Sequence, residues 1–274
     1  MLVTGATSGI GMRTALGLAR LGANVVMSGR DAGRGQAARD EVCRASGNPL
    51  VDLMLADFAS LAQVRRLAAE FEERYHRLDV LVNNAGGILP RRQESTDGYE
   101  MTWAVNHLAP FLLTNLLLGR LRASAPARVV TVASNAHLIG RIRLKDLQRR
   151  RRWSSWGAYG QSKLANILFT TELARRLAGS GVSANCIHPG IVDTNFAHSG
   201  GTAELFFRLV RPFLRKADHA AQLVLHLALS PQVDGISGRY FANGKVAWST
   251  PASRDAALAR RLWDVSARSV GITG

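Results

Sequence analysis

Tyr159 and Lys163 stand four residues apart in the run AYGQSKLANILF, residues 158–169. On an α-helix this spacing puts both side chains on one face. An ammonium fixed beside a phenol stabilises the phenolate, so we expect the pKa of Tyr159 to fall below its usual value. Such a phenol is suited to general acid and base catalysis near neutral pH. The motif alone is weak, because the same pair also occurs on solvated helix faces.

A glycine-rich turn follows the first apolar residues of the chain. Residues 1–3 have the composition of the end of a buried strand, and TGATSGIG follows at residues 4–11. The glycines allow a tight turn, a close approach to a phosphate and the packing of the next helix, expected over 12–21. The N-terminal amides of that helix would face the pyrophosphate of a dinucleotide. We therefore expect cofactor contacts from Gly5, Thr7, Ser8, Gly9, Ile10 and Gly11.

The next strand, expected over 23–30, ends in a basic residue. Sites for NAD usually carry an acid about 20 residues after the glycines, where it binds the ribose hydroxyls. Here that position holds Arg30, whose guanidinium would pair with a 2′-phosphate that a carboxylate would repel. We therefore predict NADP(H) rather than NAD(H), with Arg13 and Arg34 as weaker helpers. The alternative is that Arg30 is one more surface arginine.

Apolar strands and helices alternate along the rest of the chain. Asp31 is the expected N-cap of a helix over 31–45, and Ser60 of a helix ending at Tyr75. The other strands are expected over 50–56, 78–82, 128–133, 182–187 and 239–242. This order predicts an α/β fold, a three-layer doubly wound parallel sheet (Rossmann fold), as a single domain over 1–274. Ligands bind beyond the carboxyl ends of such strands, where Asp57, Phe58, Asn83, Ala85 and Gly86 stand.

A long apolar helix, expected over 99–121, contains Asn106 in its middle. A buried amide costs stability unless it is hydrogen-bonded. One interpretation is a satisfied core amide, and the other is that Asn106 holds a water near the active site. Ser134 stands at the carboxyl end of the following strand, on the side where ligands bind.

Composition excludes several classes. The net charge is +15, but Lys occurs only at 145, 163, 216 and 245, so the excess is almost all scattered arginine, and no nucleic-acid motif accompanies it. No apolar run reaches the roughly 18 residues of a membrane span, and no signal peptide is visible. The two cysteines, Cys43 and Cys186, suggest neither disulfides nor a metal cluster, and a cytoplasmic location follows. Because the first strand begins at Met1, a native start upstream of Met1 is left as an open alternative.

The ordered motifs resemble the short-chain dehydrogenase/reductase family over nearly the whole chain. They are TGxxxGxG at 4–11, NNAG at 83–86, and Ser134, Tyr159 and Lys163, with Asn106 upstream. The resemblance implies that Ser134 orients the substrate oxygen, Tyr159 is the general acid/base, and Lys163 supports Tyr159 and binds the nicotinamide ribose. It also implies that Asn106 orders a water of the proton path. The nicotinamide would be held by Pro189, Gly190, Ile191 and Thr194.

Finer features resemble the retinol dehydrogenase branch. These are SKLANILF at 162–169, the 25-residue gap from Ser134 to Tyr159, and ARRLWDVS at 259–266. The gap contains an insertion, about 138–156, expected to cover the site. Residues 196–216 are the expected substrate lid, and the apolar face of 204–216 could instead lie on a membrane surface. The hydrophobic N-terminal anchor of membrane-bound members is missing from this sequence.

The sequence therefore predicts an NADP(H)-dependent oxidoreductase that interconverts a carbonyl and an alcohol on an apolar substrate. The alternative is a dinucleotide-binding sensor with vestigial catalysis, against which the intact set of four catalytic residues argues. The expected partner is a small apolar molecule, with no nucleic acid and no metal. A membrane-surface contact and a homodimer remain open alternatives.

Overall fold

One mostly parallel sheet organises the chain. The computed structural model describes residues 1–190 and 217–272, so the expected lid, Ile191 and Thr194 lie outside the described residues. The strand order is β3-β2-β1-β4-β5-β6-β7-β8. The strands are β1 (Leu2–Thr4), β2 (Val25–Gly29), β3 (Val51–Leu55), β4 (Val80–Asn83), β5 (Ala127–Val132), β6 (Val182–His188), β7 (Tyr240–Ala242) and β8 (Lys245–Val246).

The order in which strands are added to the sheet changes sides at β1. β1 pairs in parallel with β2, where Val3 is opposite Met27, and with β4, where Val3 is opposite Val82. The chain adds β2 and β3 on one side of β1 and the later strands on the other. Such a switch point opens a crevice at the carboxyl ends of the strands, because the flanking helices diverge there.

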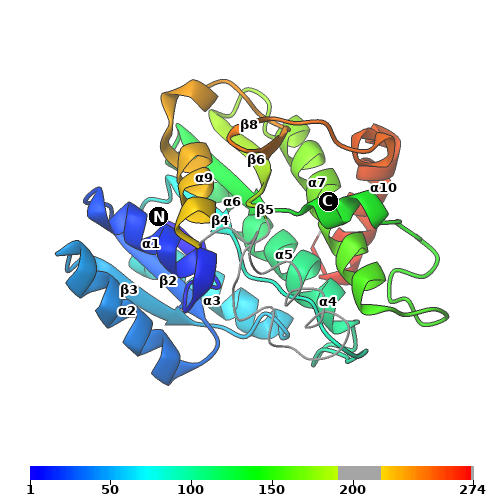
Figure 1. Ribbon diagram of the computed structural model, residues 1–274, viewed down its shortest axis with the longest axis horizontal. Coiled ribbons are helices and arrows are strands. Elements are labelled where there is room, and N and C mark those ends of the chain that lie inside the picture. The colour runs from blue at the N-terminus through cyan, green and yellow to red at the C-terminus, as the bar shows by residue number, and fades with distance from the viewer. Residues whose placement is uncertain (191–216, 273–274) are drawn as a thin grey trace.

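Helices cover both faces of the sheet, as Figure 1 shows. One face carries α1 (Gly9–Arg20), α2 (Ala32–Ser46) and α9 (Ala217–Leu229), and the other carries α3 (Leu61–Arg74), α5 (Ala109–Leu116), α7 (Ser155–Arg176) and α10 (Ala256–Ser269). Successive strand residues face opposite layers. Val25 and Met27 join the core under α1, whereas Val26 joins the core under α3 and α7. The predicted three-layer α/β fold is confirmed.

Local sequence signals explain where the helices begin. Asp31 accepts a hydrogen bond from the Arg34 amide (2.8 Å) and Ser60 from the Gln63 amide (3.4 Å), so both predicted N-caps are confirmed. No helix among the described residues is long and apolar enough to cross a bilayer.

Two expectations about elements are wrong. The helix expected over 99–121 is divided into α4 (Met101–Trp103), a π-helical turn η1 (Ala104–Leu108), α5 and α6 (Leu118–Ala123). Pro110 has no N–H for the carbonyl of residue 106, so a regular ladder cannot pass through this region. The hairpin partner β8, which runs antiparallel to β7, was not expected, because two exposed residues carry no strand pattern.

Candidate active site

A cavity of about 690 Å³ lies at the carboxyl ends of the strands, beside the switch point. Its walls come from the glycine-rich turn, the ends of β2 and β5, the segment after β4, the π-turn and the first turns of α7. All predicted site residues that the structure describes line this cavity, with the exception of Asn83. The residues that the sequence places at the carboxyl ends of different strands therefore do lie together at one cavity.

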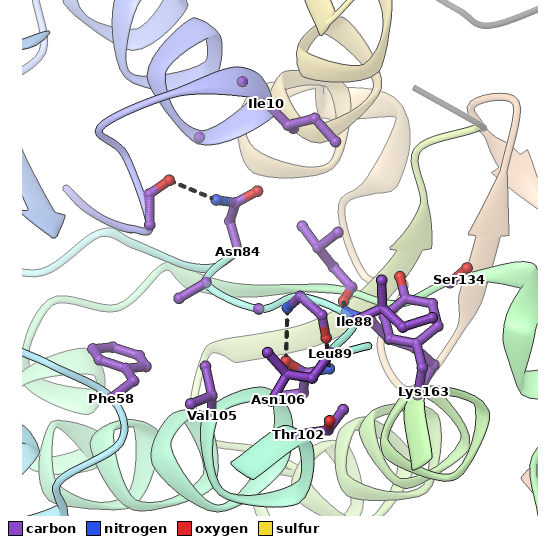
Figure 2. Close-up of a pocket in the computed structure, with 18 of the residues that line it drawn as sticks. Ile10, Phe58, Asn84, Ile88, Leu89, Thr102, Val105, Asn106, Ser134 and Lys163 are labelled. Carbon is purple, nitrogen blue, oxygen red and sulfur yellow. Dashed lines mark hydrogen bonds between the residues drawn. The ribbon is translucent and has the colours of Figure 1, made fainter. Parts of the chain in front are cut away.

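Asn83 faces the other way. It is the last residue of β4, is 3% exposed, and donates a hydrogen bond to the Thr114 hydroxyl (2.9 Å). The structure therefore does not place the Asn83 side chain at the cavity, because neighbouring strand residues point to opposite faces. Asn84 lines the cavity instead, and its amide donates to the carbonyls of Thr4 (2.8 Å) and Gly5 (3.1 Å). Figure 2 draws one of these bonds. Asn84 thus holds the glycine-rich turn in place.

The glycine-rich turn has the geometry of an anion site. Gly5 has φ +62°, and a Cβ there would lie 2.8 Å from the Ala85 Cα. A Cβ at Gly11 would lie 2.3 Å from the Gly5 carbonyl oxygen. Ser8, the N-cap of α1, makes no side-chain capping bond, and the first turn carries no acid. The orphan amides of α1 therefore open onto the cavity without a competing carboxylate and fit a dinucleotide pyrophosphate.

Arg30 lies exposed at the rim of the cavity. Within the described parts of the chain it makes no ion pair. Its two expected helpers are already paired: Arg13 lies 3.5 Å from an Asp218 oxygen, and Arg34 lies 3.6 Å from an Asp31 oxygen. Of the three arginines, Arg30 has the guanidinium left to bind an anionic ligand at this end of the cavity.

Asn106 projects from the π-turn towards the segment after β4. Its Oδ1 accepts from the Gly87 amide (2.9 Å), and its Nδ2 donates to the Gly87 carbonyl (2.9 Å) and the Ser162 hydroxyl (3.0 Å). The two bonds to Gly87 are drawn in Figure 2. Gly86 is required beside it, because a Cβ at Gly86 would come within 2.9 Å of the Asn106 Oδ1. The amide ties the cavity floor to α7.

Lys163 is a buried cation at the base of the cavity. It is 4% exposed, and its Nζ donates to the Val132 carbonyl (2.8 Å). It forms no ion pair with any carboxylate in the described ranges. Desolvation lowers its pKa to about 8, because burial disfavours the charged form. A buried ammonium with a single hydrogen bond retains donors for ribose hydroxyls, so the residues present fit a nicotinamide dinucleotide.

Tyr159 lies half-buried on the same wall. The Lys163 Nζ is 5.5 Å from the centroid of its ring, and a hydrogen bond joins its hydroxyl to Ser134. Burial nevertheless raises the Tyr159 pKa to about 12, with the Ser134 bond acting in the opposite direction. The expected fall in the Tyr159 pKa is wrong for this structure, because desolvation outweighs the hydrogen bond to Ser134.

The sequence analysis missed the apolar part of the cavity. Its additional lining residues include Ile88, Leu89, Met101, Val105 and Trp156. Ile88 and Leu89 lie in irregular backbone and the other three in short helical turns or at a helix start, where no periodic pattern indicates which side chain turns inward. Within the predicted insertion, Trp156 reaches the cavity while Leu147 is 8% exposed and packs into the core. In the part of the chain that the structure describes, no cluster of His, Cys, Asp or Glu could hold a metal ion.

These features define a member of the short-chain dehydrogenase family, whose family model matches residues 1–204. The chain is therefore an oxidoreductase of alcohol and carbonyl groups in a family that binds a nicotinamide dinucleotide. It is similar to mouse retinol dehydrogenase 12, at 43% identity over 99% of this chain and 86% of that protein. It is also similar to mouse retinol dehydrogenase 14, at 45% identity with the same two coverages. The predicted resemblance to the retinol dehydrogenase branch is confirmed.

Solved structures agree with this assignment. A putative uncharacterised protein from Mycobacterium paratuberculosis superposes with a TM-score of 0.80 and 37% identity, covering 99% of this chain and 92% of the other. A variant of the actinorhodin polyketide ketoreductase, solved with NADPH, gives a TM-score of 0.70 and 26% identity, with 88% and 94% covered.

Proposed function

We propose that this protein is an NADP(H)-dependent reductase that converts an apolar aldehyde or ketone into its alcohol, with Tyr159 as the general acid. The observation that carries the proposal is the convergence of Tyr159, Ser134, Lys163 and Asn106 at one cavity that also receives the amides of α1. A bound nicotinamide cofactor would supply the hydride.

The residues around the cavity have separable roles in this mechanism. Ser134 is hydrogen-bonded to the Tyr159 hydroxyl. It orients the substrate oxygen next to that Tyr159 hydroxyl. Tyr159 then gives its proton to that oxygen as the alcohol forms. Lys163 holds the ribose hydroxyls and passes a proton towards Tyr159, and Asn106 orders the water that connects this path to solvent.

The reductive direction requires a protonated Tyr159. A pKa raised to about 12 keeps the Tyr159 hydroxyl protonated at neutral pH, which is the state that donates a proton. Arg30 supports NADP(H), because its guanidinium, which has no ion pair among the described residues, would meet a 2′-phosphate at the rim. The polyketide ketoreductase with NADPH supplies a related structure in which that cofactor is bound.

The proposed substrate is apolar because the wall beyond Tyr159 carries aliphatic, thioether and indole side chains. We propose a cytoplasmic location with no nucleic-acid partner. For partners, the two alternatives from the sequence are a homodimer and a membrane-surface contact through residues 204–216. Those residues lie outside the described part of the chain.

The decisive experiment follows NADPH oxidation with a panel of aldehydes and ketones graded by chain length. We expect turnover that increases from short to longer apolar carbonyls and that disappears in Tyr159→Phe. Tight NADPH binding without turnover of any carbonyl would favour the alternative, a dinucleotide sensor. Turnover with NADH that equals or exceeds turnover with NADPH would contradict the cofactor assignment.

A further inference from the structure

Trp156 lies in the cavity wall beside Tyr159. The two ring centroids are 6.2 Å apart, and the ring planes are inclined by 79°. Trp156 precedes Tyr159 by three residues at the start of α7, so one helical turn carries both side chains on the same face. The indole therefore packs against the ring whose hydroxyl the proposed reaction uses.

The segment before Trp156 is hydrogen-bonded to the segment that follows β4 and to the start of α4. The Ser155 hydroxyl donates to the carbonyl of Leu89, which itself lines the cavity. Two residues earlier, the Trp153 indole N–H donates to the Glu100 carboxylate (3.1 Å). These bonds fix the approach of the insertion to α7, so the backbone on the N-terminal side of Trp156 is held in place.

Glu100 connects the insertion to α4, whose residues Met101 and Thr102 line the cavity. Its carboxylate is buried (1% exposed) and also accepts from the Trp103 amide (2.8 Å), while its own amide donates to the Gln148 side chain (2.6 Å). The next residue, Met101, lines the cavity. The hydrogen bonds of Glu100 therefore fix the position of the segment before Trp156 relative to Met101.

The groups around this part of the cavity favour flat rings. Ile88 and Leu89 provide aliphatic surface between Asn106 and Lys163 in Figure 2. Trp156 and Met101 add groups that interact with aromatic rings beyond the area that they bury, through ring–ring and sulfur–ring contacts. A saturated ring of the same size gains the buried area without these additional contacts.

We propose that Trp156 determines substrate specificity by selecting carbonyl compounds with an aromatic or conjugated ring attached to the reacting carbon. The inference rests on the proposed function and names its substrate class. Trp156 lines the same cavity as Tyr159, with its ring centroid 6.2 Å from that of the phenol ring, and from this proximity we infer that a group on the reacting carbon contacts the indole. A conjugated ring therefore meets Trp156 directly.

The test compares benzaldehyde with cyclohexanecarboxaldehyde, which have rings of equal size but different flatness. For each substrate, kcat/KM of a variant is divided by that of the wild type, so intrinsic reactivity cancels. Trp156→Leu should reduce this ratio about threefold to tenfold more for the aromatic aldehyde, mainly through KM. Trp156→Phe should restore most of the difference. The control, Trp248→Leu, changes a tryptophan that is 65% exposed and does not line the cavity, and should affect both substrates equally.

Equal losses with both aldehydes in Trp156→Leu would overturn the proposal while leaving the proposed function intact. If no carbonyl is turned over, the proposed function has failed, and the same question is answered by binding. Calorimetric titration with benzyl alcohol and cyclohexylmethanol should then show a preference for the aromatic alcohol that Trp156→Leu abolishes. Retention of that preference in the variant would also overturn the proposal.

Discussion

Replacement of Lys163 by methionine should make the folded protein more stable at neutral pH. In the unfolded chain the ammonium has a pKa of 10.5, and burial lowers it to about 8 in the folded chain. A tenfold change in a proton-binding constant corresponds to about 1.4 kcal/mol, so the buried charge costs ~3 kcal/mol at pH 7. Methionine also loses the bond to the Val132 carbonyl (2.8 Å), which costs about 1–2 kcal/mol. The net expectation at pH 7 is a gain of ~1–2 kcal/mol.

The pH dependence separates this explanation from a packing effect. Below pH 8 both states hold the proton and the cost is present in full. Between about pH 8 and 10.5 the folded state has lost the proton while the unfolded state keeps it, so wild-type stability rises with pH. Above 10.5 both states are neutral and the cost is gone. The advantage of Lys163→Met should therefore shrink by ~2 kcal/mol between pH 7 and pH 10.

Urea denaturation of both proteins at pH 7 and pH 10 measures this difference. Lys145→Met is the matched control, because Lys145 is exposed and its replacement should change stability by less than about 0.5 kcal/mol at either pH. A stability difference between wild type and Lys163→Met that is the same at both pH values would refute the reasoning. The variant should also lose turnover, which would show that a destabilising lysine is kept for its function.

Three further substitutions test the site. Tyr159→Phe should reduce kcat by about 100-fold or more with NADPH affinity nearly unchanged, and activity within tenfold of the wild type would remove Tyr159 as the acid. Arg30→Asp should raise the Kd for NADPH and shift preference towards NADH, because a carboxylate repels the 2′-phosphate; an unchanged ratio of the two Kd values would show that Arg30 does not contact that phosphate. Gly86→Ala should lower kcat, because its Cβ would lie 2.9 Å from the Asn106 Oδ1, whereas Gly119→Ala, at an exposed position where a Cβ meets open space, should not; equal kcat values for Gly86→Ala and wild type would show that Asn106 tolerates displacement.

The fold could be predicted from the sequence because the signals are local and repeated. Each apolar strand ends in polar or glycine residues, and parallel pairing brings all such ends to one edge of the sheet. Gly5, Arg30 and Asp57 therefore converge although they are distant in sequence. The choice between Asn83 and Asn84 depends on which face the last strand residue takes, and an error of one residue reverses that choice.

The electrostatics and the apolar wall could not be predicted in the same way. Spacing identifies Lys163 as a neighbour of Tyr159, but how far each pKa moves depends on desolvation, which needs the packed structure. Leu89 lies in an irregular segment and Trp156 at the start of α7, and their convergence depends on bonds such as that between Ser155 and Leu89. Sequence patterns predict the cofactor side of the cavity better than the substrate side for this reason.

The division of the helix at Asn106 had a signal in the sequence. An α-helix needs the N–H of residue 110 for the carbonyl of residue 106, and residue 110 is proline. The Ala109 amide bonds to the Ala104 carbonyl, five residues back, so the chain takes a π-turn and one residue is added without a full α-helical step. Each residue of a regular helix turns the side chain by about 100°, so the wider turn changes which residues face the cavity. Asn106 meets Gly87 at the cavity, and His107 turns to Ser266 (2.8 Å) in the core. The proline that prevents a regular helix therefore helps to aim Asn106 at the site.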